Sequence, residues 1–550
     1  MIIMKKKPFS QMINLSRSGM IACFIASMLI SVLQMLGRYL DVRNGDISMS
    51  FSKIAIEGIL FFIFCNVIII FLWKFGKKAL MSKPLSHVLF SKIWFWQLMM
   101  LIFWLPCFLA YFPGIYSYDG EPQLIQYTAG RLDNHHPIIH TLILGKCYDL
   151  GQWLMAKGIN IDGLAFYTII QVLLLSFALA YMIRFLVEKK VGRVFVILCA
   201  VYICLFPTVP IMAVSSTKDT FFTAFFILFI TGITEALYHN GKNIYFKLFV
   251  FSMGCMFFRR NGYYVILILM LWLVGLCIIK RKSAQKYLVS TAIVLFVSVI
   301  VFTISEKAVI TLTHASKGEA AEALSIPLQQ MARAFKNDDN AIRIKYGERL
   351  TSYISETGLC NYRPLISDGV KQYFNNELFA ENKKDFAKVY LELGKDYPGP
   401  YALAVLYLTK GDWHMLDTSY CRVYKNWWRD RTGYLITDAT PVFAGDFVKK
   451  SNLLPQIRAL YERFASDCTF MRCIPLMIIC APAFYVFLSL LGAVAILMKK
   501  KRGFYLVFAA ILLYLLTVFF GPCVLVRYIF PLMAAMPLCS WCVLQDDLVL

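Results

Sequence analysis

The chain has 550 residues, of which 59% are hydrophobic, 15% aromatic and only 16% charged. A soluble protein carries about 25% charged residues, so this composition excludes an ordinary soluble domain. Apolar runs of about 18 residues or more recur along the chain and predict transmembrane helices.

The net charge of +23 makes nucleic acid a partner to consider, but the position of the charges argues against it. Residues 311–470 contain 21 basic and 19 acidic residues, whereas the rest of the chain contains 35 basic and 14 acidic residues. The basic surplus lies in short loops between apolar runs, at 5–7, 74–83, 184–193, 280–286 and 499–502. Short basic loops remain on the cytoplasmic side of a membrane. Membrane topology therefore explains the charge, and we predict no nucleic-acid partner.

In chain order from a cytoplasmic N-terminus, the apolar runs predict twelve spans and a cytoplasmic C-terminus. The spans are 18–38, 53–73, 91–111, 163–184, 194–210, 219–237, 245–258, 262–279, 287–306, 471–497, 503–520 and 523–543. Residues 138–156 are also apolar, but a span there would place the basic loop at 184–193 outside. We therefore predict that 138–156 is an interfacial helix lying along the headgroups.

The predicted fold class is mainly α. It is a polytopic membrane helical bundle with interfacial helices in an early outer loop and a mostly helical extracytoplasmic domain. Four regions follow in chain order: an N-terminal cytoplasmic end with two transmembrane helices (1–85), a transmembrane core (86–310) with the outer loop 112–162, the extracytoplasmic domain (311–470) and the C-terminal transmembrane helices (471–550).

The outer loop that follows the third span is unusually rich in reactive side chains. Asp119 comes within ten residues of the end of the apolar run, and Glu121 follows it. A carboxylate near a hydroxyl or amine acceptor can take its proton during acyl or glycosyl transfer. The alternative is that both residues merely cap a helix beginning near Pro122, since acidic side chains favour a helix N-terminus.

Three histidines, His135, His136 and His140, follow in the same loop. His136 and His140 would share a helix face, and two histidines so spaced can chelate a metal. Pro137 stands between them, however, and no HExxH motif accompanies them. Hydrogen bonding to an anionic or hydroxyl-rich ligand is the better interpretation, and a plain interfacial role is the alternative.

Cations stand at the outer ends of three predicted spans: Lys218, the Arg259–Arg260 pair, and Arg527. Cations are disfavoured on this face, and at membrane depth they usually face the protein interior or a partner. A lipid phosphate is the natural anion there, and arginine offers it a bidentate fork. The alternative for each is snorkelling or pairing with a neighbour, such as Lys218 with Asp219.

The large outer segment supplies candidates without a chemical signature. Its Ser325–Arg333 stretch, SIPLQQMAR, mixes polar and apolar residues at a predicted helix start. Trp413, Trp427 and Trp428 would suit sugar stacking, although interfacial anchoring is the simpler role for Trp. The spacing of Cys360, Cys421 and Cys468 gives no disulfide framework. No Walker A, GxSxG, Rossmann or kinase motif occurs anywhere in the chain.

Together these motifs resemble the GT-C superfamily of polytopic membrane glycosyltransferases, in which a loop near the membrane carries a catalytic acidic residue and a His-Pro motif opens an interfacial helix. Asp119 and His136-Pro137 match that arrangement. The combination of PGIYSYDGEPQ, NHHPIIHT, STKDT, RRNG, SIPLQQMAR and RYIFP resembles a poorly characterised bacterial cell-envelope branch of this superfamily. The chain departs from the family pattern in one respect, because two spans precede the one that leads to Asp119.

The resemblance implies transfer of a sugar from a polyprenyl-phosphate donor to an extracytoplasmic cell-envelope acceptor, with inversion. Asp119, or else Glu121, would be the general base, and Lys218, Arg259, Arg260 and Arg527 would hold the donor phosphate. Substrate-binding roles are implied for Tyr118, Gln123, His135, His136, Asn261, Gln329, Gln330 and Arg333. No cofactor is required by this scheme, and a divalent cation has no support in the sequence.

Two other functions were weighed against this one. A polysaccharide polymerase or O-antigen-ligase-type enzyme also has about twelve spans, but its key Arg and His would lie in the large late loop. A lipid or solute transporter would carry charges in mid-span along a path, and the predicted spans are nearly free of them.

Overall fold

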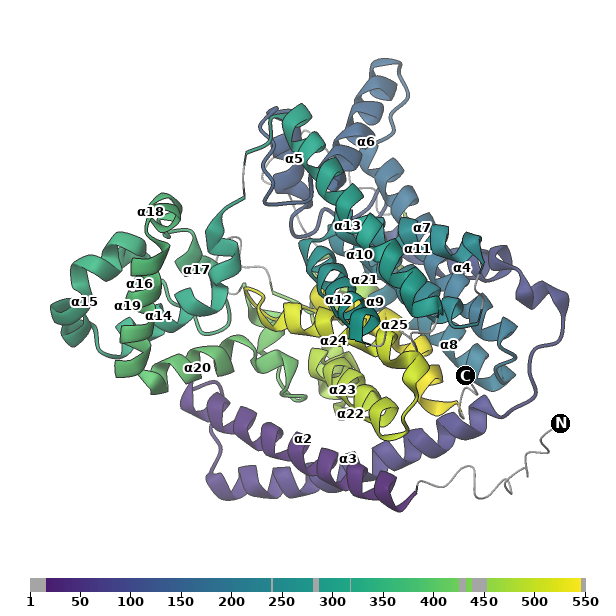
Figure 1. Cartoon of the computed structure of the whole chain (residues 1–550), viewed down its shortest axis with the longest axis horizontal. Helices are drawn as coiled ribbons and strands as arrows, with labels where there is room; N and C mark the ends of the chain where they lie inside the picture. The colour runs from purple at the N-terminus through teal and green to yellow at the C-terminus, as the bar shows by residue number, and fades with distance from the viewer. Residues whose placement is uncertain are drawn as a thin grey trace.

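The computed structural model describes residues 16–238, 241–279, 286–316, 318–424, 432–437 and 453–545. These residues are mainly α-helical (Figure 1). Throughout the described ranges, β pairing is limited to isolated bridges. The predicted mainly helical class is therefore confirmed.

The elements of the first half, up to the end of the long helix α13, form most of the bundle. They are α2 (Arg17–Arg43), α3 (Phe51–Leu80), η1 (Val88–Ser91), α4 (Ile93–Ala110), α5 (Gly120–Thr128), α6 (Ile138–Ala156), α7 (Gly163–Glu188), α8 (Arg193–Leu205), α9 (Thr208–Val214), α10 (Lys218–Ala236), α11 (Lys242–Phe258), α12 (Arg260–Ile279) and α13 (Lys286–Thr313).

The second half begins with shorter helices and returns to the bundle. Its elements are η2 (Ala320–Leu324), α14 (Ser325–Asn337), α15 (Asp339–Tyr353), α16 (Glu356–Cys360), α17 (Asp368–Lys371), α18 (Asn376–Glu381), α19 (Lys383–Asp396), α20 (Pro398–Leu408), η3 (Lys410–Asp412), η4 (Ser419–Arg422), α21 (Pro455–Ala465), η5 (Thr469–Arg472), α22 (Ile474–Cys480), α23 (Pro482–Met498), η6 (Arg502–Phe504), α24 (Tyr505–Phe519) and α25 (Val526–Leu544).

Within the described residues, nine helices are long and apolar enough to cross a bilayer, or eleven when α8 with α9 and α22 with α23 each form one bent span. The chain is therefore a membrane protein. The segment predicted as the span 245–258 lies in α11, which has 17 residues, and the count of twelve remains a prediction. Helix α6 begins and ends as predicted, and it is not among the nine.

Helices α10 and α25 form the centre of the bundle. Their most apolar windows are 89% and 78% buried, compared with 28% and 22% for α2 and α3. An apolar groove of about 2070 Å³ separates the α2–α3 hairpin from α8, α23 and α25. The hairpin is therefore peripheral, whereas side chains at the ends of α10 and α25 lie in the interior.

Helices α14–α20 form a separate helical domain at one end of the bundle, at the left of Figure 1. This domain has its own apolar core, which includes Leu328, Leu350 and Leu393. It meets the bundle where the Ser367 N–H donates to the Pro522 carbonyl at 2.9 Å, beside an isolated bridge between Ile366 and Cys523. The loop at Pro522–Cys523 leads directly into α25, so we call this end of the bundle the domain end.

The cysteines noted in the sequence do not form a disulfide in this structure. Cys360, Cys421 and Cys468 are all free thiols. Cys421 and Cys468 are hydrogen-bonded neighbours. Trp427 and Trp428 lie outside the described residues, whereas Trp413 is buried against the α2–α3 hairpin.

Candidate functional site

The loop that carries Asp119 is fastened to the segment that opens α10. The Ile115 N–H donates to the Val214 carbonyl at 3.0 Å, and the Ser216 N–H donates to the Ile115 carbonyl at 2.8 Å. Gly120 is required at the next step, because a Cβ there would lie 2.6 Å from Ser216 Oγ and 2.8 Å from the Ser216 carbonyl. The two segments therefore hold Asp119 and the start of α10 together.

Asp119 pairs with two cations from distant parts of the chain. Its Oδ2 lies 2.9 Å from Nη1 of Arg527, in the first turn of α25, and 3.1 Å from Nζ of Lys218, at the start of α10. Asp119 occupies the N-cap position of α5, but its side chain makes no capping hydrogen bond. The helix-capping alternative is therefore wrong for the Asp119 carboxylate.

His136 joins this arrangement through Lys218. The two side chains meet at 2.8 Å between Nζ and Nδ1, and His136 is buried. Burial and the charge of Lys218 hold the pKa of His136 well below its usual range. His136 is therefore neutral at neutral pH and accepts a hydrogen bond from the Lys218 ammonium. A neutral imidazole does not balance the positive charge of Lys218.

A second carboxylate, that of Asp219, is fully buried and shares Arg527 with Asp119. Its Oδ1 is 2.7 Å from Nη1 of Arg259, and its Oδ2 is 3.3 Å from Nη1 of Arg527. Arg259 also donates to the Tyr514 hydroxyl at 3.2 Å, and Arg527 donates to the Tyr528 hydroxyl at 3.0 Å. Buried charges need such partners, because an unpaired one costs several kcal/mol.

We call the five charged residues Asp119, Lys218, Asp219, Arg259 and Arg527 the charge cluster. Its three cations face two carboxylates, so the cluster carries one unit of positive charge in excess. Burial alone would raise the pKa of Asp119, but Arg527 and Lys218 outweigh it and hold that pKa well below its usual value. The Asp119 carboxylate is thus ionised at neutral pH, and the excess positive charge is maintained.

One donor in the charge cluster has no partner. Nε of Arg527 is buried and makes no hydrogen bond to any described residue. The Arg527 guanidinium also lies over the ring of Tyr118, 4.2 Å from its centroid. Lys218 and Asp119 remain partly open, with 15% and 23% of their side chains exposed. The charge cluster therefore combines an unpartnered guanidinium N–H, an excess of positive charge and two partly exposed side chains. This combination is suited to binding an anion.

Glu121 and Gln123 lie on α5 close to Asp119. Glu121 is buried in the first turn and interacts electrostatically with Tyr116. Gln123 is fully buried: its Nε2 donates to Thr141 at 2.9 Å and its Oε1 meets Nδ1 of His140 at 3.1 Å. These contacts tie α5 to α6, and a substrate contact for either residue remains a prediction.

The two other predicted histidines face different surroundings. His140 uses its second ring nitrogen, Nε2, to meet the Tyr167 hydroxyl at 2.7 Å. Because both its ring nitrogens have protein partners, His140 does not form a chelating pair with His136. His135 is partly exposed, and its Nδ1 lies 3.9 Å from Glu322 of η2.

Arg260 is separated from the charge cluster although it follows Arg259. Its guanidinium donates to the Asn134 carbonyl in the loop that carries His135 and His136. It lines a cavity of about 280 Å³ with Tyr263, Glu306 and other residues of α6, α11, α12 and α13. The structure therefore places Arg259 and Arg260 on two different sides of the site.

The remaining predicted residues contact the scaffold. Asn261 donates to Thr517 at 2.8 Å and so joins α12 to α24. On α14, Gln329 donates to the Ile366 carbonyl at 2.6 Å, Gln330 accepts from Tyr390 at 2.7 Å, and Arg333 donates to Tyr362 at 2.8 Å. The contacts of Gln329, Gln330 and Arg333 join parts of the helical domain, so these residues do not lie with the charge cluster.

Three residues of the site were not predicted: Asp219, Tyr514 and Tyr528. From the sequence, Asp219 is predicted only as a partner for its neighbour Lys218. The signal available in the sequence was a carboxylate in the first turn of an apolar run, two residues after the capping residue Thr217. An acidic residue at that depth needs a cationic partner, and Arg259 and Arg527 were the unpaired candidates.

A protein-family model described as a family of unknown function (DUF6020) matches residues 124–546. The match covers more than half of the chain, and the chain therefore belongs to this family. Lys218, Asp219, Arg259 and Arg527 fall within the matched residues, whereas Asp119 lies just before them. No curated protein and no solved structure matches the chain.

Proposed function

We propose that this family member is a membrane glycosyltransferase that moves a sugar from a polyprenyl-phosphate donor to a cell-envelope acceptor. The acceptor would be a glycan, a teichoic-acid-type polymer, a lipid or a protein. The observation that carries the proposal is the excess of one positive charge in the charge cluster. A polyprenyl-phosphate sugar is a phosphodiester with one negative charge, which would complete the balance.

The proposed orientation places the domain end of the bundle outside a bacterial plasma membrane, with both termini in the cytoplasm. The described basic loops at 74–83, 184–193 and 499–502 support this orientation, because they lie at the helix ends opposite the domain end. The lipid donor would then lie in the bilayer, with its phosphate at the level of the charge cluster. An acceptor outside the membrane would reach the sugar from the side of the helical domain.

In the proposed reaction Asp119 is the general base. The acceptor hydroxyl or amine gives its proton to the Asp119 carboxylate while it attacks the anomeric carbon of the sugar. The bond between that carbon and the phosphate oxygen breaks, and polyprenyl phosphate leaves with the electron pair. Direct displacement inverts the anomeric carbon. Arg527 and Lys218 would stabilise the growing negative charge of the leaving phosphate.

The ion pairs of Asp119 also suggest how the base is controlled. A carboxylate held by Arg527 and Lys218 is a weak base, since its pKa lies well below the usual value. An arriving phosphate would share these two cations and weaken their hold on Asp119. The carboxylate would therefore become more basic only when the donor is bound.

The proposal is tested by Asp119→Asn in membranes supplied with a radiolabelled polyprenyl-phosphate sugar. We expect sugar transfer to fall by roughly 10²–10⁴-fold, with normal expression. Glu121→Gln tests the neighbouring carboxylate, and Asp149→Asn, half exposed on α6, is the matched control. Full activity of Asp119→Asn would sink the mechanism. A requirement for Arg333 in place of Asp119 would favour a polymerase or ligase.

A further inference from the structure

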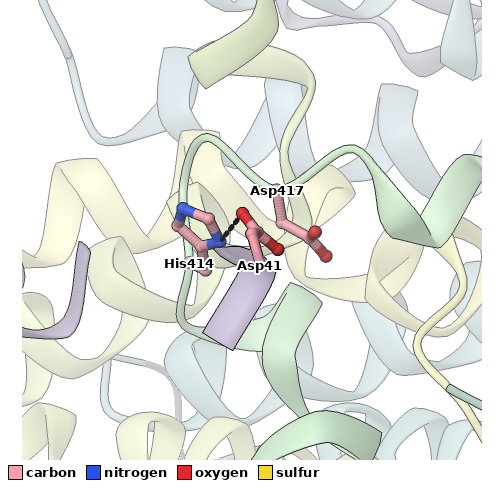
Figure 2. A group of neighbouring side chains, drawn as sticks. All are labelled: Asp41, His414 and Asp417. Carbon is pink, nitrogen blue, oxygen red and sulfur yellow. Dashed lines mark ion pairs between the residues drawn. The ribbon is translucent and has the colours of Figure 1, made fainter. Parts of the chain in front are cut away.

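A second buried polar cluster lies where the end of α2 meets the loop after α20, away from the charge cluster. Figure 2 shows Asp41 on α2 beside His414 and Asp417 on that loop, with a dashed line between His414 and Asp41. All three are buried, with 5%, 0% and 2% of each residue exposed. One ligand atom from each lies within 4.8 Å of the other two.

His414 is the residue that needs an explanation. Neither ring nitrogen has a hydrogen-bond partner among the described residues. Nδ1 lies 3.8 Å from Oδ2 of Asp41, which is too far for a hydrogen bond. The ring lies against α2 at Gly37, where a Cβ would come within 2.4 Å of Cγ. An imidazole held this firmly without a partner is costly, unless the site binds something that the ring can ligate.

The carboxyl groups around His414 have two cationic neighbours and one unpartnered oxygen. Lys410 donates to Asp41, and its Nζ lies 3.3 Å from Oδ1 of Asp417. Nη1 of Arg38 lies 3.7 Å from Oδ2 of Asp41, but Arg38 also pairs with Glu57 at 2.8 Å. A third carboxyl, Asp412, is buried, and its Oδ1 has no hydrogen-bond partner among the described residues. An unpartnered carboxyl oxygen and an unpartnered imidazole in one buried cluster favour a cation as the ligand.

We propose that Asp41, His414 and Asp417 bind a first-row transition-metal dication of the Zn²⁺ or Mn²⁺ class. Ligand atoms about 2.0–2.2 Å from such an ion lie roughly 3–4 Å apart, so the three side chains need to close by about 1 Å. One imidazole nitrogen with two carboxylate oxygens favours these metals over Ca²⁺ and Mg²⁺, which prefer oxygen alone. Lys410, whose Nζ contacts an Oδ1 atom of both Asp41 and Asp417, would orient the two carboxylates.

The site has a structural role that does not depend on the proposed sugar transfer. Asp41 belongs to the peripheral hairpin, whereas His414 and Asp417 belong to the loop that follows the helical domain. Among the described residues, the polar contacts at this junction include the Tyr407 hydroxyl donating to the Leu40 carbonyl at 3.1 Å and the Leu416 N–H donating to Gln34 at 3.4 Å. An ion would fasten the hairpin to the rest of the protein. The competing account is that the Lys410 ammonium alone closes the cluster.

The test uses the full-length protein in detergent, stripped with EDTA, loaded with Zn²⁺ or with Mn²⁺, and analysed by elemental mass spectrometry. We expect about one ion per chain in the wild type and at least a tenfold weaker affinity in His414→Gln. His314→Gln, an exposed histidine, is the control that keeps the ion. Unchanged binding in His414→Gln would overturn the proposal.

A measurement on the wild type covers the case in which His414→Gln does not fold. EDTA should lower the melting temperature, and Zn²⁺ or Mn²⁺, but not Mg²⁺, should restore it, because a ligand that binds only the folded state stabilises it. A stripped protein that takes up no ion and melts at the same temperature would show that Lys410 alone closes the cluster.

Discussion

Arg527 and Asp119 are in contact at 2.9 Å although 408 positions separate them in the chain. Asp119 comes from the loop before α5, and Arg527 comes from the first turn of α25, so the contact joins the early outer loop to the most C-terminal helix described. Asp219 extends the contact to Arg259 at the end of α11. The site is thus assembled from four places in the chain and has no local sequence signature.

Arg527 should govern donor affinity more than any other cation, because it touches both carboxylates. We expect Arg527→Gln to lower kcat/KM for the donor by about 10²–10³-fold, and Arg527→Lys to recover only part of this loss, since a lysine lacks the guanidinium fork. Steady-state transfer assays over a range of donor concentration measure the effect. Arg343→Gln, in the helical domain, should behave as wild type.

The pH dependence of transfer should reveal the ion pairs of Asp119. The carboxylate must be ionised to act, so kcat/KM falls only below its pKa in the free enzyme. That pKa is held well below the usual value by Arg527 and Lys218, so the acidic limb should lie at very low pH. Burial raises the pKa of Asp119, and in Lys218→Gln only Arg527 of these two cations remains to lower it. The acidic limb should therefore move to higher pH in this variant.

Comparison of two kinetic parameters makes this test sharper. If donor phosphate shares Arg527 and Lys218, the acidic limb of kcat should lie at higher pH than that of kcat/KM, because kcat reports the complex. Lys157→Gln removes an exposed cation elsewhere and is the control. An acidic limb that does not move in Lys218→Gln would contradict the assignment of the base.

Gly120 should tolerate no side chain. A Cβ would lie 2.6 Å from Ser216 Oγ and 2.8 Å from the Ser216 carbonyl, and backbone cannot yield to this contact as a flexible side chain can. We expect Gly120→Ala to separate the loop from the start of α10 and to lower transfer by at least about tenfold, since small misplacements of catalytic groups are costly. Gly275→Ala in α12, where the space is open, is the matched control, and equal losses in both variants would argue against the effect.

The helical domain should depend on its own core. Leu350 is fully buried there, and Leu350→Ala should destabilise the domain by about 2–5 kcal/mol. Hydrogen exchange of the full protein should show lost protection in α14, α15 and α19, with little change in α10. Leu391→Ala, at an exposed position in α19, should change protection little, and loss spread evenly over the bundle would contradict a separate core.

Features that depend on a single segment of the chain could be predicted from the sequence. Apolar length predicted the bundle helices. The basic loop at 184–193 led to the prediction that 138–156 is not a span; α6 is not among the nine described helices that are long and apolar enough to cross a bilayer, and its interfacial position stays a prediction. Arg259, Lys218 and Arg527 could be selected because a cation at a helix end within the membrane needs a partner. Each of these inferences depends on one segment and its immediate charges.

Pairing between segments could not be predicted in the same way. Lys218 and Asp219 are neighbours in sequence, but successive side chains on a helix point about 100° apart. Lys218 therefore faces Asp119, whereas Asp219 faces Arg259 and Arg527. Similarly, Gln330 on α14 looked available to a ligand, yet it accepts from Tyr390, 60 positions away.

The long separation between Asp119 and Arg527 also bears on how the protein is made. Helices enter the membrane in the order of synthesis, so Asp119 and Lys218 are in place long before α25 leaves the ribosome. Until then Asp219 has only Arg259 as its cation, and the anion-binding donor on Arg527 does not exist. The charge cluster is therefore complete only at a late step of biogenesis, when α25 packs against α10 and α23. If the cluster binds the donor as proposed, that capacity arises at the same step.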